Sequence, residues 1–332
     1  MNPFTVQPQT FEAIMHRYAP HLEACRDLIL ADLKKTPGTT VLAGHFQGGK
    51  MFRALLAFAA SSAIGIEPRK IIHVASALEL LHGASLIHDD IVDEAAERRS
   101  RPALHVQMGI GPALILGDYL ILRAFTVLRE SQHVHGPGRV MEASNTLNDY
   151  AQLCCLGELH ELMPTHEGNP EDEYLAIVQG KTASQFAAAV TLPAILGGGT
   201  SGDIEALRTY GLNVGIAFQI QDDVLDIVGD TELLGKPVGT SLVKERLLLP
   251  LIYLERYGSP MALRHYRRIP QTEAGRPAKL AALLKKEGIL DRIQVTQDRY
   301  VSAALQALEC IRPSDERAIL SMLAAYAVNH HT

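Results

Sequence analysis

Long apolar stretches, separated by short segments rich in glycine and proline, form the dominant pattern along the chain. Strictly alternating apolar and polar positions, the pattern of half-buried strands, are hard to find, whereas alanine and leucine are frequent. Breaks at 136–138, 168–170 and 197–199 mark ends of the apolar segments. The pattern predicts helices at residues 10–35, 49–65, 69–93, 109–131, 137–161, 171–190, 203–228, 243–257, 276–309 and 313–328.

The connections between these predicted helices are short, which is typical of antiparallel helices in a bundle. Segments that are apolar on nearly all sides, such as 71–87 and 186–196, should lie in the middle of the bundle. No solenoid-type repeat and no low-complexity linker divides the 332 residues. We therefore expect an all-α protein, a single-domain antiparallel helical bundle that spans residues 1–332.

Composition and charge narrow the possible classes of function. Hydrophobic residues make up 47% of the chain and charged residues 20%, which provides enough apolar material for a sizeable core. The formal net charge is −6 and the lysines and arginines are scattered, whereas a nucleic-acid surface would show a clustered basic footprint. We therefore expect no nucleic-acid partner, and we expect any anionic ligand to be held by a few placed cations together with metal.

Nothing in the sequence indicates export or a membrane span. The first residues lack the charged start and the apolar block of a signal peptide. No uninterrupted apolar run of about 18 residues occurs, and the richest run, 247–254, is broken by Pro250. The four cysteines form no Cys-x-x-Cys pair, so a disulfide framework is not expected. The expected location is the cytoplasm.

Two acidic clusters share one spacing, and each follows a strongly apolar stretch. The first is Asp89-Asp90-x-x-Asp93 and the second is Asp222-Asp223-x-x-Asp226. On a helix, positions i and i+4 lie one turn apart on the same face, so the first and last aspartates of a cluster can converge on one ligand. Ionised carboxylates in apolar surroundings are costly without cations, and Mg²⁺ commonly shares its coordination between carboxylates and phosphate oxygens. The clusters therefore predict a magnesium site.

Two other interpretations of the clusters are weaker. A solvated acidic helix end would explain one such cluster, but two identical spacings within apolar helices argue against it. A two-metal hydrolase also uses paired carboxylates, but it usually recruits histidine ligands. His88 directly precedes Asp89 and, on a helix, points in a different direction.

Cations suited to phosphate oxygens are ordered around the acidic clusters. The segment Gly48-Gly49-Lys50-Met51-Phe52-Arg53 offers backbone freedom at a helix start, where free N–H groups favour phosphate. Arg98 and Arg99 follow the first cluster, and arginine can bind phosphate oxygens with two N–H groups. Lys181-Thr182 precedes an apolar helix, and Lys236 follows the second cluster. Each feature alone would be ordinary, but their order indicates a site for diphosphates.

In this order the motifs resemble those of the trans-isoprenyl diphosphate synthases. The resemblance runs from residue 48 to residue 253 and includes both aspartate-rich motifs, the first of them followed by Arg98-Arg99. Its other parts are Gly48-Gly49-Lys50-x-x-Arg53, Lys181-Thr182, Phe218-Gln219 before the second acidic motif, Gly235-Lys236-Pro237-x-Gly239 and Leu249-Pro250-Leu251. Together these motifs are highly specific.

The resemblance implies the isoprenoid synthase type I fold, all-α around a central cavity, usually as a homodimer. It implies head-to-tail condensation of isopentenyl diphosphate with an allylic diphosphate, with about three Mg²⁺ between the two acidic clusters. The residues implied for the allylic diphosphate are Arg98, Lys181 and Lys236, and those for isopentenyl diphosphate are Lys50, Arg53, His82 and Arg99. Gln219 and Thr182 would face the reacting carbons.

Four positions depart from the family pattern. Ser241 stands where an aspartate is common, Arg246 where a lysine is common, Ser100 where a glycine is common and Glu161 where a glutamine is frequent. Arginine and lysine carry the same charge but are not equivalent. These departures bear on substrate preference and rate more than on the class of reaction.

Product length in this family depends on the depth of the cavity. Ala84 and Ser85 lie about one turn before Asp89, where bulky aromatic residues tend to cap the pocket and small ones leave it open. We therefore expect an all-trans product of geranylgeranyl length or longer, with the preferred starter left open.

Two alternatives remain. A class I terpene cyclase shares the fold, but it would carry an Asn/Ser/Glu second metal motif and needs no isopentenyl site. A non-catalytic partner subunit of a prenyl synthase would be expected to lose the aspartate-rich motifs.

Overall fold

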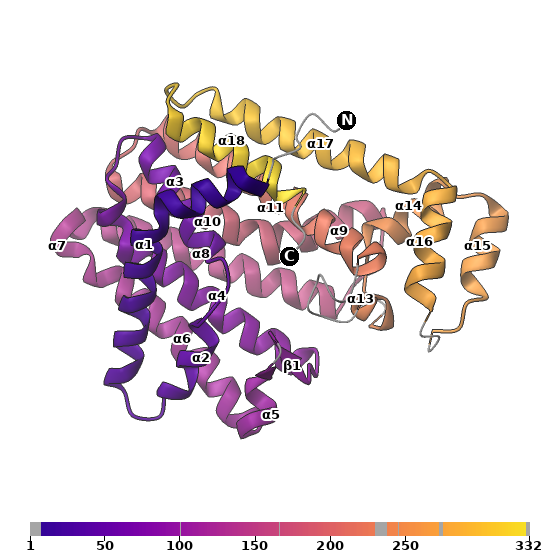
Figure 1. Cartoon of the computed structure of the whole chain (residues 1–332), viewed down its shortest axis with the longest axis horizontal. Coiled ribbons are helices and arrows are strands. Elements are labelled where there is room, and N and C mark those ends of the chain that lie inside the picture. Colours follow the sequence, from indigo (N-terminus) through magenta and orange to yellow (C-terminus); the bar gives the residue numbers. More distant parts are fainter. Residues whose placement is uncertain are drawn as a thin grey trace.

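The computed structural model describes residues 8–99, 101–165, 167–229, 238–244, 246–271 and 275–329. Within these ranges the chain is almost entirely helical, with one short antiparallel hairpin between β1 (Glu97–Arg98) and β2 (Arg101–Pro102). Figure 1 shows α7 (Gln132–His135) at one end of the bundle and α15 (Pro260–Arg267) and α16 (Arg276–Lys286) at the other. The longer helices are α1 (Pro8–Lys35), α3 (Phe52–Ala63), α4 (Ile72–Val92), α6 (Ile110–Glu130), α8 (Pro137–Leu162), α9 (Pro170–Val178), α10 (Ser184–Gly197), α11 (Ser201–Val228), α14 (Leu249–Tyr257), α15 (Pro260–Arg267), α16 (Arg276–Lys286), α17 (Ile289–Leu308) and α18 (Asp315–Ala327).

Shorter elements connect them. They are the 3₁₀ turns η1 (Thr40–Leu42) and η2 (Pro68–Ile71), the π-helical turn η3 (Gln179–Ala183), and the short helices α2 (Ala43–Phe46), α5 (Leu104–Met108), α7 (Gln132–His135) and α13 (Thr240–Val243).

Helices α4, α10 and α11 form the centre of the bundle and pack against α3, α6, α8 and α17. Every residue of α10 from Phe186 to Leu196 is buried, as the apolar pattern predicted. Two glycines let α11 lie close to the preceding helices, because a Cβ atom at Gly211 would be 2.7 Å from the Cα atom of Ala187 and one at Gly215 would be 2.5 Å from that of Ala183. These contacts fix α11 against α10 and η3 in the turns that precede the second acidic cluster.

Buried apolar side chains form two clusters. The larger one is built mainly from α1, α3, α4, α6, α10 and α18, and the smaller one from α9, α14, α16 and α17. Helix α11 contributes to both, with Val214 in the larger cluster and Ile216 and Ile220 in the smaller. The second acidic cluster lies in the part of α11 that follows these residues.

Three expectations about helix boundaries were wrong for local reasons. The helix expected at 276–309 is interrupted by Gly288, whose φ of 67° is left-handed and ends α16 before α17 begins. The segment 243–257 is not one helix either, because α14 starts only at Leu249, with Pro250 in its first turn. Helix α15 was missed, although Ser259 caps it by accepting from the Ala262 N–H.

The helix expected at 49–65 starts at Phe52. Gly48, Gly49 and Met51 all have positive φ values, of 88°, 76° and 46°, so the backbone before Phe52 cannot be α-helical. Lys50 therefore lies in a loop, while Arg53 lies in the first turn of α3.

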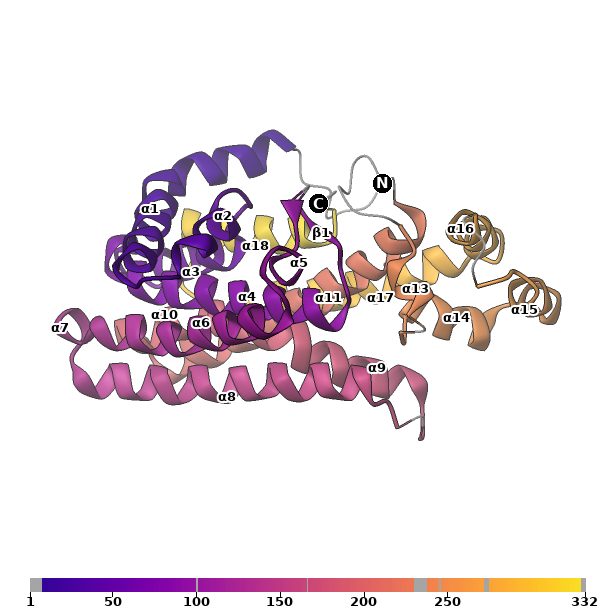
Figure 2. The same ribbon diagram turned by 90° about the horizontal axis from the view of Figure 1, so that it is seen from below.

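Two described helices are long and apolar enough to cross a membrane by length and composition alone, Pro68–Val92 and Ile110–His135. The first is mostly buried in the bundle, as core helices are, whereas only 28% of the apolar window of the second is buried. Figure 2 shows α6, from this second segment, lying beside α8 along one edge of the molecule.

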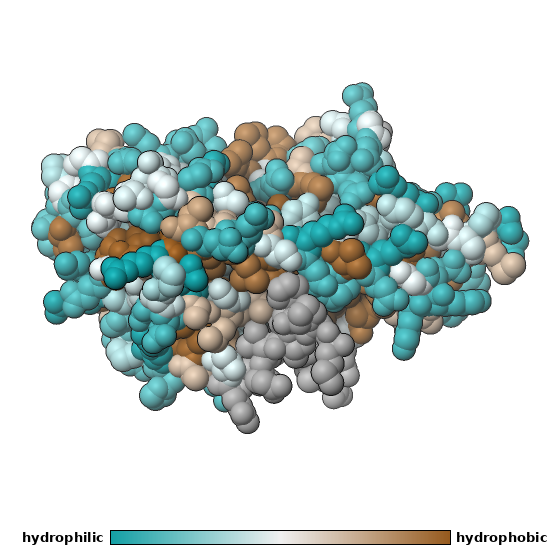
Figure 3. Space-filling view, turned by 90° about the horizontal axis from the view of Figure 1, so that it is seen from above, coloured by the Kyte–Doolittle hydropathy of each residue, from teal (hydrophilic) through white to brown (hydrophobic). Residues whose placement is uncertain are grey.

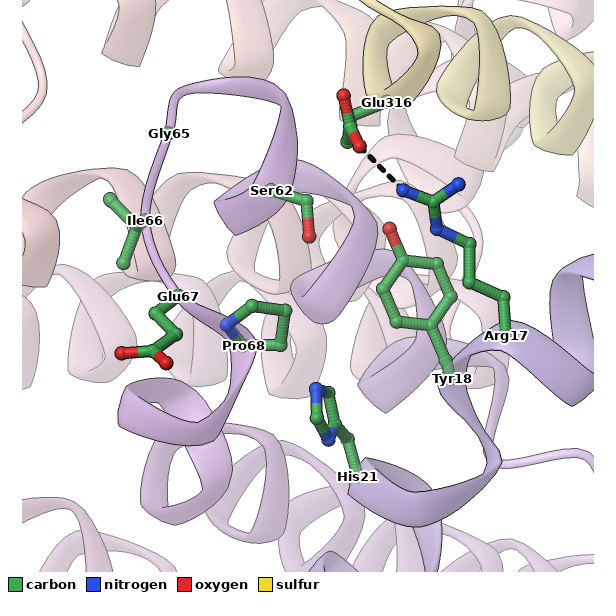
Figure 4. Close-up of a pocket in the computed structure, with 9 residues that line it drawn as sticks. All are labelled: Arg17, Tyr18, His21, Ser62, Gly65, Ile66, Glu67, Pro68 and Glu316. Carbon is green, nitrogen blue, oxygen red and sulfur yellow. Dashed lines mark hydrogen bonds and ion pairs between the residues drawn. The ribbon is translucent and has the colours of Figure 1, made fainter.

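The surface elsewhere is more polar. In Figure 3, which views the side formed by α17 and α18, hydrophilic residues predominate and apolar patches are small. A shallow hollow of about 360 Å³ lies where α1, α3 and α18 meet, lined by Arg17, Tyr18, His21, Glu67 and Glu316 among others (Figure 4). The 2.5 Å ion pair between Arg17 and Glu316 crosses it, and it contains none of the predicted site residues.

Candidate active site

The first acidic cluster lies at the carboxyl end of α4. Asp89 and Asp90 are in its last turn, and Asp93 is the C-cap residue, whose N–H donates to the Asp89 carbonyl oxygen at 2.7 Å. A helix carboxyl end carries partial negative charge, so three carboxylates there are unfavourable unless cations compensate them. Burial raises the pKa of Asp89 to about 6, and the nearby Lys181 ammonium opposes this shift.

Nearby cations compensate two of these carboxylates. The Arg98 guanidinium, presented by the β1–β2 hairpin, binds the buried Asp90 through Nε at 2.7 and 2.8 Å and through Nη2 at 2.6 Å. Lys244 Nζ lies 2.7 Å from Asp93 Oδ1, and Arg246 Nη2 pairs with the same oxygen. Sequence reasoning missed Lys244, which lies 151 residues from Asp93 along the chain.

The second acidic cluster lies in the last turns of α11. Tyr174 Oη donates to Asp223 Oδ2 at 2.7 Å, and Gln219 Nε2 donates to Asp223 Oδ1 at 2.9 Å. Burial nevertheless raises the pKa of Asp223 to about 7. Asp226 is also buried and accepts from the Ser241 backbone N–H at 3.0 Å, whereas Asp222 is partly exposed.

Thr182 and Gln219, expected to face the reacting carbons, are joined directly. The Thr182 hydroxyl donates to Gln219 Oε1 at 2.7 Å, and Gln219 Nε2 donates in turn to Asp223 Oδ1. These two hydrogen bonds fix the orientation of the Gln219 amide. Tyr174, which also donates to Asp223, had no signal in the sequence, because an isolated tyrosine in an apolar helix looks like a core residue.

Lys181 lies in the π-helical turn η3, a type of irregularity that is frequent at functional sites. Two glycines bring α8 and η3 together, because a Cβ atom at Gly157 would lie 2.3 Å from the Lys181 backbone nitrogen. Lys181 Nζ consequently reaches Glu158 at 2.6 Å and Glu161 at 2.7 Å, both on α8. Burial lowers the pKa of Lys181, but Glu161, Asp89 and Glu158 outweigh burial and raise it overall, so Lys181 is a cation.

Among the residues expected to bind a second diphosphate, Arg53, His82 and Arg99 form a basic group, whereas Lys50 is directed toward α18 and α1. Lys50 Nζ donates to Tyr326 Oη at 2.8 Å and lies 6.0 Å from the centre of the Phe11 ring. The buried Arg53 Nε and His82 Nδ1 atoms have no hydrogen-bond partner among the described residues. Arg99 has a left-handed backbone, with a φ of 51°, and its exposed side chain lies beside the His45 carbonyl oxygen at 3.4 Å.

Arg53 connects the basic group to both acidic clusters electrostatically. Burial lowers the pKa of Arg53, while Glu79, Asp89 and Asp222 all act in the opposite direction. Asp89 and Asp222, 133 positions apart in the chain, therefore act on one guanidinium. Burial also lowers the pKa of His82 well below its usual value, with Arg53 and Arg99 adding to the effect, so its imidazole is neutral. Sequence reasoning missed Glu79, which accepts from the Ala54 N–H at 3.0 Å behind Arg53.

The described residues contain no ready-made cluster of three or more His, Cys, Asp or Glu side chains arranged as metal ligands. Their chemistry nevertheless fits magnesium bound together with diphosphate. The carboxylates are hard oxygen donors, and Mg²⁺ usually completes its coordination with phosphate oxygens and water. The unpartnered Arg53 Nε and His82 Nδ1 atoms are suited to an oxygen-rich ligand.

Two expectations lie outside the described residues, the role of Lys236 and the departure at Ser100. The other three departures lie in the site. The backbone N–H of Ser241 donates to Asp226, a contact that does not depend on the serine side chain, and Arg246 lies between Asp93 and Glu161.

Comparisons with known proteins identify the family of the chain. A model of the polyprenyl synthetase family matches residues 39–286. The chain is 34% identical over 299 residues to a short chain isoprenyl diphosphate synthase of Methanothermobacter thermautotrophicus, covering 88% of this chain and 91% of that protein. It is 31% identical to an octaprenyl diphosphate synthase of Haemophilus influenzae, covering 86% and 85% of the two chains.

A solved structure supports the same family. The polyprenyl synthase of Caulobacter crescentus, in complex with calcium and isoprenyl diphosphate, superimposes with a TM-score of 0.86 at 32% identity, covering 96% of this chain and 98% of that one. The chain therefore belongs to the polyprenyl synthetase family. The expected family and the all-α isoprenoid synthase fold are confirmed.

Proposed function

We propose that this protein is a magnesium-dependent prenyltransferase that condenses isopentenyl diphosphate head to tail with an allylic diphosphate. The observation that carries the proposal is that the turn η3 links the two aspartate-rich helix ends: Thr182 bonds to Gln219, which bonds to Asp223 of the second cluster, while the adjacent Lys181 acts electrostatically on Asp89 of the first. The similarity to isoprenyl and octaprenyl diphosphate synthases supports the same reaction. The alternatives are not favoured, since both acidic motifs and the second basic group are intact.

In the proposed mechanism, Asp89, Asp90, Asp93 and Asp222 would hold the metal, with Asp223 and Asp226 contributing directly or through water. Asp90 and Asp93 would then share their carboxylates between the metal and their cationic partners, Arg98 for Asp90 and Lys244 and Arg246 for Asp93. Bound Mg²⁺ would supply electrostatic stabilisation of the departing diphosphate. Lys181 and Arg98 hold the allylic diphosphate, with the predicted Lys236, while Lys50, Arg53, His82 and Arg99 hold isopentenyl diphosphate.

The remaining work falls to the apolar surroundings and to the Thr182–Gln219 pair. The side-chain oxygen dipoles of Thr182 and Gln219 lie near the allylic carbocation, and the buried helices exclude water that would capture the cation. The double bond of isopentenyl diphosphate attacks the cation, and the released diphosphate takes the final proton. No protein base is required.

The direct test is an incubation of the purified protein with isopentenyl diphosphate, Mg²⁺ and each of dimethylallyl, geranyl and farnesyl diphosphate, with product masses read by mass spectrometry. We expect at least one starter to be elongated, and we expect a chelator to abolish elongation. Absence of product with all three starters would reject the proposal.

Product length provides a second test. Ala84 is buried in α4, about one turn before Asp89, and the small residue there supports a product of geranylgeranyl length or longer. Replacing Ala84 with Phe should shorten the main product by at least one isoprene unit, because the ring occupies the path of the growing chain. Ala84→Ser, which adds a single oxygen, serves as the control and should leave the product unchanged. Unchanged length in a folded Ala84→Phe variant would place the floor of the pocket elsewhere.

We propose that the protein is a homodimer formed through α6 and α8. These neighbouring helices both expose large apolar side chains, and apolar patches on a surface usually mark protein interfaces. Burial against a second copy would also explain the exposed apolar helix at Ile110–His135 without a membrane span. The exposed residues include Ile110, Leu114, Ile115, Leu122, Leu153 and Leu156.

Replacing Leu156 with Lys should therefore convert the dimer to a monomer at micromolar concentration, measured by light scattering after gel filtration. Val295 on α17 is also exposed, at 52%, and lies on another element, so Val295→Lys is the matched control and should remain dimeric. A monomeric wild-type protein would contradict the proposal.

We also propose that residues 1–332 form a single domain, because α11 contributes to both apolar clusters. The proposed location is the cytoplasm.

A further inference from the structure

Two of the residues that depart from the family pattern contact each other. Arg246 Nη1 lies 3.4 Å from Glu161 Oε2, and Arg246 Nη2 pairs with Asp93 Oδ1. Both members of the contact are largely buried, with side-chain exposures of 18% for Arg246 and 14% for Glu161. The departures at Glu161 and Arg246 are therefore neighbours in space, although they lie on different elements.

The same Glu161 oxygen that faces Arg246 also accepts from Lys181 Nζ at 2.7 Å. Glu161 thus holds two cations at once, and Arg246 extends the network to Asp93. Burial lowers the pKa of Arg246, but Glu161 and Asp93 outweigh it and raise the pKa overall, so the guanidinium is charged. The network links a predicted metal ligand to a predicted diphosphate ligand through side chains alone.

The chemistry of the two side chains explains why they occur together. A guanidinium is a planar fork whose separate arms can bond to carboxylates that lie apart, whereas the donors of an ammonium share one nitrogen and need carboxylates that converge on it, as Glu158 and Glu161 do on Lys181. A glutamine at position 161 would leave one arm of Arg246 without an anionic partner, and a lysine at position 246 would not reach both carboxylates. Breaking one side of a buried ion pair is more costly than exchanging both sides together.

We propose that Glu161 and Arg246 are a matched pair of positioning residues that hold Lys181 and Asp93 in place for the allylic diphosphate. Neither residue needs to touch the reacting carbons. The pair sets the geometry of the site before substrate arrives, which reduces the cost of ordering the site on binding. This inference rests on the proposed prenyltransferase function.

The experiment is a double-mutant cycle of wild type, Glu161→Gln, Arg246→Lys and the double variant. Two quantities are measured, the binding of inorganic pyrophosphate with Mg²⁺ by calorimetry and the kinetic constants for each substrate. We expect each single variant to weaken pyrophosphate binding and to raise KM for the allylic diphosphate about tenfold, with KM for isopentenyl diphosphate unchanged. The double variant should recover to within about threefold of wild type, because a lysine at position 246 can pair with Asp93 alone and does not need the second anionic partner that Arg246 finds in Glu161.

A matched control cycle uses an exposed pair on α11, in which Arg208 Nη2 lies 2.7 Å from Glu205 Oε1. Glu205→Gln and Arg208→Lys should change neither measurement, alone or together, because exposed ion pairs contribute little. Thermal unfolding is recorded for every variant. Glu161→Asp, which keeps the charge but shortens the side chain, is measured as well, and an intermediate loss of pyrophosphate affinity is expected.

Additive losses in the double variant, or wild-type behaviour in both single variants, would overturn the matched pair. If Glu161→Gln fails to fold, the Glu161→Asp result decides: wild-type affinity in that variant also overturns the proposal. These outcomes differ from a failure of the proposed function, in which the wild-type protein itself would form no product with any starter.

Discussion

Replacing Asp89 with Ala should lower the turnover number by about 10³-fold or more, because a carboxylate placed to hold the metal and the departing diphosphate is lost. The fold should survive. Asp89 lies at the negatively charged carboxyl end of α4, and burial already raises its pKa to about 6, so its removal relieves an unfavourable charge. Steady-state kinetics with saturating Mg²⁺ and both substrates measure the loss, and circular dichroism with thermal unfolding measures the fold.

The control for this variant is Asp27→Ala, which removes an exposed carboxylate on α1 and should retain wild-type turnover. Full activity in Asp89→Ala would contradict the assignment of the first acidic cluster. Loss of helical content in that variant would instead mean that Asp89 is structural.

The metal-free protein should become more stable at alkaline pH when Asp223 is replaced with Asn. Burial raises the pKa of Asp223 from 3.8 to about 7, so the folded state binds this proton more tightly than the unfolded chain does. The stability associated with the proton is fully present below about pH 4 and is lost as the pH rises through about 7. The asparagine amide would remain neutral throughout, so the variant should gain about 1–3 kcal/mol at about pH 8.5 and much less at about pH 5.5.

Thermal unfolding in the presence of a chelator at these two pH values measures the difference. Tyr174→Phe provides a control of opposite sign, because the Tyr174 hydroxyl donates to the Asp223 carboxylate. That variant should lose more stability at the higher pH than at the lower. A gain in Asp223→Asn that does not depend on pH would show that the buried carboxylate is not the cause.

Much of the site could be predicted because its parts are short motifs within single helices. Asp89 and Asp93, or Thr182 beside Lys181, are recognisable from neighbouring residues alone. The partners of these residues could not be found in this way, because Lys244, Tyr174 and Glu79 meet them only through packing between distant segments. Their sequence surroundings are those of ordinary charged or buried residues.

The same distinction applies to the fold. Apolar segments such as 186–196 predicted the central helices correctly, because burial on all sides leaves a clear pattern. The helices expected at 276–309 and 243–257 run through Gly288 and Pro250, but the left-handed φ at Gly288 and the first-turn position of Pro250 define new helix ends. Local backbone geometry of this kind is decided by neighbouring elements as much as by the residue itself.

The contact between Gly157 and the backbone of η3 has a further consequence. Where main chain rests on main chain, the separation of two elements cannot be adjusted by exchanging side chains of different size. The reach of Lys181 across the site is therefore a fixed dimension of the enzyme. In this protein, substitutions at the floor or the entrance of the pocket can change its depth without changing how far Lys181 lies from α8.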